Sequence, residues 1–231
     1  MLMSDYVARY DQLGDEDELF RIPARKEFVL SRIGEGKRVL DVGCLGGRIT
    51  RLIMRQGNEV VGVEANPKAA EIARGKGIPV KVANVEQGLP FEAGAFDVVH
   101  AGEIVEHLFD TRFFFTESFR VLRASGELLF SVPNLNSLEN RIRIVGGGYL
   151  ATAGAYPEDR FGDRVRVFNL DKVRELCAQT GFEVAEVQGV HALEARGTLV
   201  DASLGWVGRF LPGMAKILLV RAVKAPARGS G

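Results

Sequence analysis

The sequence predicts a doubly wound α/β fold with a mostly parallel sheet, and three observations support this prediction. Apolar, β-branched segments alternate with segments of helical periodicity along residues 38–133. Glycines follow the first of these strands directly, as they do in turns that lead from a strand into a helix. The chain has 231 residues, of which 46% are hydrophobic, and this is enough to bury the core of one α/β domain.

The alternating patterns set the expected order of the elements. The expected strands cover residues 38–42, 59–64, 79–83, 96–101 and 127–133, and the expected helices cover 47–56, 67–75 and 112–123. Strands joined through helices form βαβ units, and these units build parallel sheets. Two later strands, 182–190 and 215–223, are separated by only a short segment, so we expect them to pair antiparallel at one edge of the sheet.

The domain prediction places one domain at residues 35–223 and three special regions around it. Residues 1–34 are expected to form a helical arm or lid, and 224–231 a flexible tail. An insert at 134–168 follows the end of a strand, where ligands of such sheets bind, so it is expected to contribute to an acceptor pocket; a surface loop is the alternative. Residues of the arm and insert expected near an acceptor are Tyr6, Tyr10, Arg25, Tyr149, Tyr156 and Arg160.

The charge balance argues against a nucleic-acid or membrane-surface partner. Thirty basic and thirty acidic residues give a formal net charge of zero, and the sequence pI is near 6.9. No bulk field therefore attracts polyanions. The arginines at positions 141, 143, 164 and 166 are expected to be scattered over a solvated face; a local basic patch is the alternative.

Cysteine usage and the N-terminal sequence predict a cytoplasmic protein. Cys44 and Cys177 match neither a metal-ligand spacing nor a secreted disulfide framework. The first twenty residues lack the apolar centre of a signal peptide. No apolar run approaches the ~20 residues that a membrane span needs. The composition carries no indication of an oligomeric state.

The glycine turn in VLDVGCLGGR (39–48) predicts a small-molecule cradle. Gly43, Gly46 and Gly47 are spaced GxxGG and not GxGxxG, which disfavours NAD or FAD, and the chain has no GxxxxGK[ST] loop for a nucleoside triphosphate. The turn still brings backbone amides and a helix N-terminus to a ligand, an arrangement that suits a carboxylate as well as a phosphate.

A carboxylate is expected at the tip of the second strand, where EVVGVE ends in Glu64. The oxygens of this carboxylate can accept hydrogen bonds from both hydroxyls of a ribose, as acids at this position do in nucleoside-binding α/β folds. Together with the glycine turn, Glu64 predicts a nucleoside ligand that carries a carboxylate.

Four ordered motifs resemble class I S-adenosylmethionine-dependent methyltransferases. They are VLDVGCLGG, VVGVEAN, ANVEQGLPFEAGAFDVVHAGEIVEHL and RVLRASGELLFSVPN, within residues 36–134, and FNLDKVRELCAQTGFEV is similar to the end of the same domain. The resemblance implies a Rossmann-like methyltransferase fold of seven strands with an antiparallel strand at the edge. It also implies S-adenosylmethionine as the cofactor and S-adenosylhomocysteine as its product.

The resemblance assigns the cofactor-binding residues one by one. It implies that Asp41, Gly43 and Gly46 hold the methionine end and that Glu64 holds the ribose with Ala65 beside it. Where the family usually has an aspartate that accepts a bond from the adenine amino group, this chain has Asn84, followed by Val85. An asparagine carbonyl can accept that bond without charge assistance; the alternative is that Asn84 only forms a turn.

The candidate catalytic residues follow the fourth strand in AGEIVEHL (101–108). Methyl transfer depends largely on holding the two reactants in line, and an oxygen acceptor additionally needs a base. Glu103 and His107 are four residues apart and would share a helix face if a helix began there. In the family an EHL sequence recurs with very different substrates, so His107 ordering the loop is the alternative.

Two further groups of side chains are expected to be structural. His100 falls within a predicted buried strand, where a neutral, hydrogen-bonded histidine is usual. Four phenylalanines at positions 113, 114, 115 and 119 are expected to pack a helix against the sheet as core residues.

Glu103, Glu106 and His107 also form an ExxEH sequence. It resembles half of the metal site of the small-RNA 3′-terminal 2′-O-methyltransferases, which use two glutamates and two histidines. The region that would supply the remaining histidine reads DRVRVFN, so no metal is expected.

These observations predict O-methylation of a small-molecule hydroxyl with S-adenosylmethionine. An RNA 2′-O-methyltransferase with a partial metal site, a non-catalytic cofactor-binding module and an NAD or nucleotide-sugar enzyme remain as alternatives.

Overall fold

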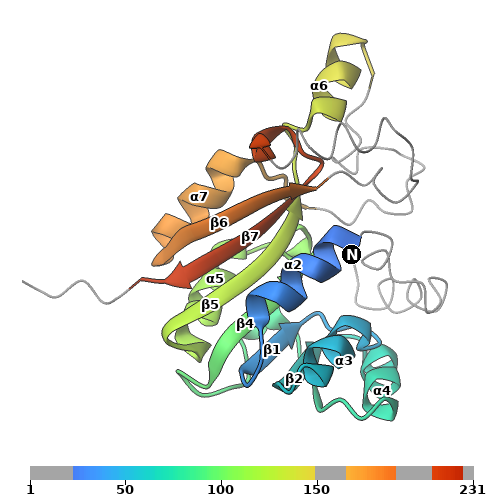
Figure 1. Cartoon of the computed structure of the whole chain (residues 1–231), viewed down its shortest axis with the longest axis vertical. Helices are drawn as coiled ribbons and strands as arrows, with labels where there is room; N and C mark the ends of the chain where they lie inside the picture. Colours follow the sequence, from blue (N-terminus) through green and yellow to red (C-terminus); the bar gives the residue numbers. More distant parts are fainter. Residues whose placement is uncertain (1–22, 149–164, 191–209, 226–231) are drawn as a thin grey trace, which may run out of the picture.

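The computed structural model describes residues 23–148, 165–190 and 210–225. Their strands form one seven-stranded sheet (Figure 1). The spatial order of the strands is β3-β2-β1-β4-β5-β7-β6. Their bounds are β1 Arg38–Val42, β2 Glu59–Glu64, β3 Val80–Val82, β4 Phe96–Gly102, β5 Leu122–Pro133, β6 Phe182–Val190 and β7 Ile217–Lys224. The predicted mostly parallel, doubly wound sheet is confirmed.

The sheet is parallel from β3 to β5 and antiparallel around β7. β1 pairs in parallel with β2 and with β4, and β2–β3 and β4–β5 are parallel as well. β7 lies between β5 and β6 and runs antiparallel to both. The predicted antiparallel pairing of the last two strands is therefore confirmed.

The strand order creates a switch point between β1 and β4. From β1 the chain proceeds outward to β2 and β3, whereas from β4 it proceeds in the other direction to β5. Ligands of open α/β sheets bind outside the carboxyl ends of the strands at such a point. The fold therefore places the glycine turn after β1 and the AGEIVEHL segment at the end of β4 side by side, at the carboxyl ends of the parallel strands.

Helices cover both faces of the sheet (Figure 1). Their bounds are α2 Pro23–Ile33, α3 Arg48–Arg55, α4 Pro67–Gly75, α5 Thr111–Val121, α6 Leu138–Val145 and α7 Leu170–Gln179, with 3₁₀ turns η2 Val85–Gln87, η3 Val105–His107 and η5 Pro212–Met214. On one face, Phe28 and Ile33 of α2 and Ile53 of α3 are buried in one cluster with Val39 and Leu129 of the sheet. The described part of the predicted N-terminal arm thus includes a core helix.

Phenylalanines of α5 build the core on the opposite face. Phe114 and Phe115 are fully buried, and the Phe115 ring meets Phe130 and Phe182 edge to face at centroid distances of 5.1 and 6.2 Å. The predicted core role of these two residues is confirmed. Phe113, by contrast, is 36% exposed.

The boundary between α5 and β5 differs most from the sequence prediction. α5 ends at Val121, and β5 begins at Leu122 instead of 127, because Leu122 is already extended and pairs with Phe96 of β4. Ser125 has a φ of 59°, and the pairing register shifts here, which marks a bulge that the apolar pattern does not reveal. The insert predicted at 134–168 contains α6, which begins after Ser137; the Ser137 side chain accepts a bond from the Asn140 N–H.

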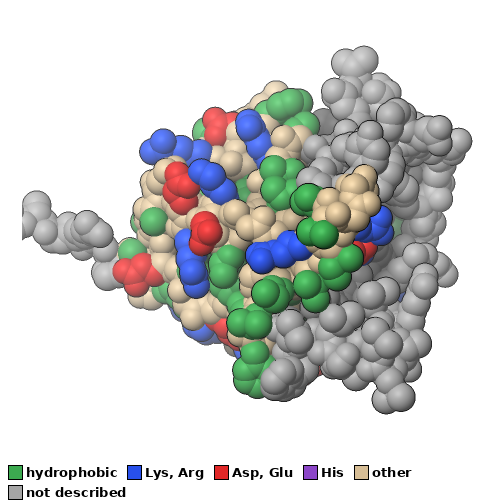
Figure 2. Space-filling model, turned by 90° about the horizontal axis from the view of Figure 1, so that it is seen from above, with side chains coloured by type: hydrophobic (Ala, Val, Ile, Leu, Met, Phe, Trp, Pro, Cys, Tyr) green, Lys and Arg blue, Asp and Glu red, His purple; other side chains and the backbone are tan. Residues whose placement is uncertain are grey.

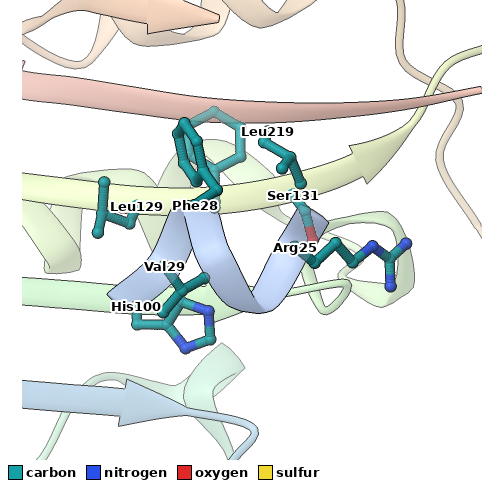
Figure 3. Close-up of a pocket in the computed structure, with 8 residues that line it drawn as sticks. Arg25, Phe28, Val29, His100, Leu129, Ser131 and Leu219 are labelled. Atoms are coloured by element: carbon teal, nitrogen blue, oxygen red, sulfur yellow. The ribbon is translucent and has the colours of Figure 1, made fainter. Parts of the chain in front are cut away.

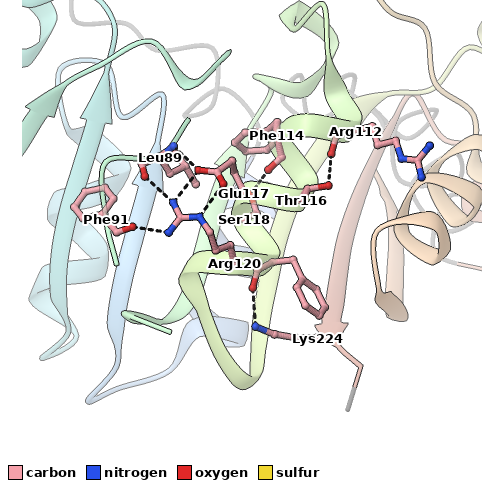
Figure 4. A network of polar contacts seen from close by, with 10 residues as sticks. Leu89, Phe91, Arg112, Phe114, Thr116, Glu117, Ser118, Arg120 and Lys224 are labelled. Carbon is pink, nitrogen blue, oxygen red and sulfur yellow. Dashed lines mark hydrogen bonds and ion pairs between the residues drawn. The ribbon is translucent and has the colours of Figure 1, made fainter. Parts of the chain in front are cut away.

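An arginine-centred network fixes the segment before β4 against α5 (Figure 4). The Arg120 guanidinium donates to the carbonyl oxygens of Phe91 and Leu89 at 2.7 and 2.9 Å and to the Glu117 carboxylate at 2.8 Å. The same carboxylate accepts the Leu89 N–H, and its bond to Arg120 lowers the pKa of Glu117. These bonds brace the chain between η2 and β4.

Basic side chains do not gather into one patch on the face shown in Figure 2, where they alternate with acidic and hydrophobic ones. Arg143 pairs with Glu139, and Arg166 donates to the Phe109 carbonyl. Arg164 and the expected acceptor-side residues other than Arg25 lie outside the described residues, as does the tail from 226 onward. Among the helices that the structure describes, none combines the length and apolar character required to cross a bilayer.

Candidate active site

The glycine turn after β1 contains three residues in the left-handed conformation. Gly43 and Gly47 have φ values of 70° and 75°, and Leu45 between them has a φ of 48°. A Cβ on Gly47 would lie 2.2 Å from Ile78 Cδ1, so only glycine fits there. α3 begins directly after Gly47, and no side chain within the described ranges caps it, so its amides face the turn. The arrangement suits an anionic group of a ligand.

Glu64 connects the end of β2 to this turn. Its carboxylate accepts the Leu45 N–H at 3.0 Å and the Asn66 N–H at 2.8 Å, and the residue is 2% exposed. Burial raises the pKa of Glu64, whereas the bonds from Asn66, Leu45 and Ala65 oppose the rise. The predicted ribose acceptor thus lies beside the glycine turn, although Glu64 is 19 residues away from Leu45 along the chain.

Asp41 has both carboxylate oxygens engaged within the protein. Thr50 of α3 donates its hydroxyl to one oxygen at 2.5 Å, and His100 Nδ1 of β4 lies 2.7 Å from the other. Asp41 is 1% exposed and His100 3% exposed. The expectation of a buried, hydrogen-bonded His100 is confirmed; its partner and the role of Thr50 were not predicted.

Asn84, at the end of β3, forms the turn that leads into η2. Its side-chain oxygen accepts the Glu86 N–H at 3.0 Å, and the residue is partly buried. The adjacent Val85 is 6% exposed and packs in the core. The turn-forming alternative for Asn84 is therefore observed, and its carbonyl oxygen retains a second lone pair for a ligand.

Glu103 and His107 would share a helix face only if a helix began at Glu103, and no helix begins there. Glu103 has a φ of 51° and precedes the short turn η3, and α5 begins only at Thr111. The Glu103 N–H bonds to Ser131 Oγ at 3.1 Å, and the bonds to β5 hold the residue in the left-handed conformation.

Arg25 of α2 forms an ion pair with Glu103. Their side chains are 3% and 16% exposed, so the pair joins the first described helix to the loop after β4 in a largely buried place. Arg25, expected on sequence grounds to lie near an acceptor, therefore lies at the carboxyl edge of the sheet. His107 keeps 28% of its side chain exposed, and its Nε2 lies 3.9 Å from Glu106 Oε1.

The site contains neither a reactive thiol nor a ready-made metal cluster in the part of the chain that the structure describes. Burial raises the pKa of Cys44 and raises that of Cys177 to about 12. No group of three or more His, Cys, Asp or Glu side chains within the described ranges is arranged to hold a metal ion.

Comparisons with known proteins agree with this fold. A methyltransferase domain matches residues 40–130. The chain is 29% identical over 178 residues to the ubiquinone biosynthesis O-methyltransferase of Aromatoleum aromaticum, a match that covers 73% of this chain and 74% of that protein. The protein of the same description from Hahella chejuensis is 33% identical over 135 residues, and the match covers 55% of this chain and 57% of that protein, less than two thirds of its length.

Solved structures share the fold along almost the whole chain. A methyltransferase of Thermotoga maritima superposes with a TM-score of 0.68 at 19% identity and covers 96% of this chain and 98% of that one. The 1,6-didemethyltoxoflavin-N1-methyltransferase of Burkholderia thailandensis, solved with S-adenosylhomocysteine, has a TM-score of 0.66 at 19% identity and covers 97% and 87% of the two chains.

The strand order, the glycine turn and the domain match point to one class of protein. They support a class I S-adenosylmethionine-dependent methyltransferase. Its sequence relatives include ubiquinone biosynthesis O-methyltransferases at about 30% identity.

Proposed function

We propose that the chain transfers the methyl group of S-adenosylmethionine to a hydroxyl oxygen of a small molecule. The observation that carries this proposal is the buried Glu64 carboxylate, which is bonded to the glycine turn at the switch point of the sheet. When bound, the cofactor supplies an electrophilic methyl group on a sulfonium. The protein has to hold the acceptor oxygen in line with that group, exclude water and take up the hydroxyl proton.

The residues fit the cofactor by their chemistry. The turn containing Gly43 and Gly46 offers backbone amides and the N-terminus of α3 to the methionine carboxylate. The Glu64 carboxylate accepts backbone N–H groups of Leu45, Asn66 and Ala65, and a carboxylate has about four acceptor sites, so it retains acceptor capacity for the ribose, with Ala65 beside it. Asn84 and Val85 follow β3, where the adenine would lie, and the Asn84 carbonyl would accept the bond from its amino group.

His107 is the better of the two proton acceptors that we propose. The Glu103 carboxylate is held by Arg25, which makes its release for proton transfer costly. The His107 imidazole is 28% exposed, so a bound acceptor can reach it, and its Nε2 lies 3.9 Å from Glu106 Oε1. Glu103 would then position the loop, and His107 would take the proton.

A small molecule is the acceptor that the charge and the relatives favour. The formal net charge is zero, and basic side chains alternate with acidic ones on the face in Figure 2, so no polyanion surface is evident there. Because the similar proteins from Aromatoleum and Hahella are named for O-methylation in ubiquinone biosynthesis, hydroxyl-bearing intermediates of that kind are the first acceptors to test.

Calorimetry with S-adenosylmethionine and S-adenosylhomocysteine tests the cofactor part of the proposal. The titrations are run first with EDTA and then with magnesium or manganese, and we expect binding that does not depend on the metal. Binding only with metal would favour the partial ExxEH site, and preferential binding of NAD would refute the cofactor assignment.

Product analysis tests the reaction itself. Formation of S-adenosylhomocysteine with a phenolic panel, but not with RNA oligonucleotides, is the expected result. Cofactor binding without turnover on either class of acceptor would identify a binding module instead.

A further inference from the structure

Three buried polar side chains from three elements meet beneath the glycine turn. Asp41 lies in the buried part of β1, Thr50 lies in the first turn of α3, and His100 is in β4. Their exposed fractions are 1%, 0% and 3%. Thr50 and His100 each contact a different oxygen of the Asp41 carboxylate, at 2.5 and 2.7 Å.

The contacts bracket the turn in sequence and in space. Asp41 precedes residues 43–47, and Thr50 follows them, so their hydrogen bond closes the β1-to-α3 connection. His100 lies directly opposite Asp41 in the parallel register of β1 and β4, which directs both side chains to the same face. That face is the one covered by α2, and His100 lines the small cavity there together with Arg25 and Ser131 (Figure 3).

A buried charge of this kind is expensive unless it is paired. A carboxylate at 1% exposure loses its hydration, and hydrogen bonds from Thr50 and from His100 compensate for that loss. The neighbouring side chains of β4, Val98, Val99 and Ala101, are apolar and buried, so His100 is the one residue in that stretch able to supply a donor. Both Asp41 oxygens are thus bonded to protein groups, and the carboxylate connects β1 to α3 and to β4.

We propose that Thr50 and His100 are positioning residues for the cofactor turn and that they act through Asp41. They hold the Asp41 carboxylate so that residues 43–47 keep their left-handed turns and the N-terminus of α3 stays directed at the ligand. Asp41 then contributes to cofactor affinity through the geometry of the turn, not through contact with the methionine end. This inference rests on the proposed function, in which that turn holds the cofactor.

Paired substitutions separate the hydrogen bonds from the packing. Thr50→Val and His100→Leu remove the donors, whereas Thr50→Ser and His100→Asn keep a donor of similar reach. Thr50→Val and His100→Leu are expected to weaken S-adenosylhomocysteine binding by about tenfold each. Thr50→Ser and His100→Asn are expected to keep most of the wild-type affinity. Ser118→Ala is the matched control, because it removes a fully buried hydroxyl that bonds to Phe114 O in α5, away from the turn.

Hydrogen exchange supplies a readout that needs neither cofactor nor turnover. Amides of residues 43–50 are expected to exchange faster in Thr50→Val and His100→Leu than in the wild type, with no change there in Ser118→Ala. Unchanged exchange in the folded variants would overturn the positioning role whether or not the protein binds the cofactor. If Asp41→Asn lost affinity while Thr50→Val and His100→Leu kept it, Asp41 would be a direct ligand, and the inference would fail while the proposed function stood. A wild-type protein that bound no cofactor would instead refute the proposed function.

Discussion

The substitution Glu64→Gln tests the cofactor site most directly. Glutamine has the size of glutamate, but it replaces one acceptor oxygen by an NH₂ group, which would face a backbone N–H donor of Leu45 or Asn66. The ribose hydroxyls would also lose a charged acceptor. Loss of one charge-assisted hydrogen bond costs about 1.5–3 kcal/mol. The dissociation constant of S-adenosylhomocysteine is therefore expected to rise roughly ten- to a hundredfold.

Folding stability is expected to change less than affinity. Burial raises the pKa of the Glu64 carboxyl above its ordinary value of 4.5. Because the ionised carboxylate is less favourable in this buried place than in the unfolded chain, the raised pKa lowers the free energy of unfolding above that pH. Glutamine removes this unfavourable contribution at neutral pH and thereby offsets part of the lost hydrogen bonding. Urea unfolding and calorimetry on the same preparations measure the two effects separately.

The pH dependence of binding follows from the same shift. If the ribose binds the ionised carboxylate, affinity is full above the raised pKa of free Glu64 and falls as the pH drops through it. In Glu64→Gln this contribution to the pH dependence is expected to disappear.

A matched control lies at the other end of the same strand. Glu59 has a side chain that is 68% exposed and pairs only loosely with Arg38, at 3.4 Å. Glu59→Gln should bind S-adenosylhomocysteine as the wild type does. Wild-type affinity in a folded Glu64→Gln variant would remove Glu64 from the cofactor site and refute this reasoning.

Three further substitutions address the turn, the base and the core. Gly47→Ala places a Cβ 2.2 Å from a buried side chain at a φ of 75°. It is expected to destabilise the protein by more than about 1 kcal/mol and to weaken cofactor binding. Gly75→Ala, whose Cβ meets nothing within 4 Å, should do neither. His107→Ala should leave the affinity for S-adenosylhomocysteine unchanged and lower kcat for a hydroxyl acceptor; a large loss of affinity in calorimetry would mean that the residue supports the cofactor loop instead. Phe115→Ala, at a fully buried position, is expected to cost about 3–5 kcal/mol in urea unfolding, and a loss below 1 kcal/mol would contradict the assigned core.

The local sequence was enough to predict most of the elements of this fold. Strands and helices with clear periodicity fall where expected, and α4 begins at Pro67 after Asn66, whose side chain caps it. The boundary between α5 and β5 was missed because Leu122 fits an apolar helix position as well as a strand position, and its pairing with Phe96 decides between them.

The candidate site was predictable in part. Glu64 was found from its place at a strand end, and the glycine turn from its spacing, because both signals are local. Thr50 was missed, although a polar residue between the buried Ile49 and Ile53 was a signal in the helical pattern. The left-handed Glu103 was missed because its conformation depends on bonds to Ser131 of the next strand.

The sequence by itself therefore determined the α/β architecture and the position of the glycine turn, and it predicted a nucleoside ligand, since these follow from short patterns of apolar residues, glycines and one acid. Only the tertiary structure decided how the polar residues pair. Asp41 and His100 are 59 residues apart, and they meet because β4 lies beside β1 with these two positions in register. Arg25 meets Glu103 because α2 packs on the sheet across β1, β4 and β5, which brings its first turn to the loop after β4. Such pairings depend on strand order and register, which are set by the burial of the whole core and are not encoded in any single segment.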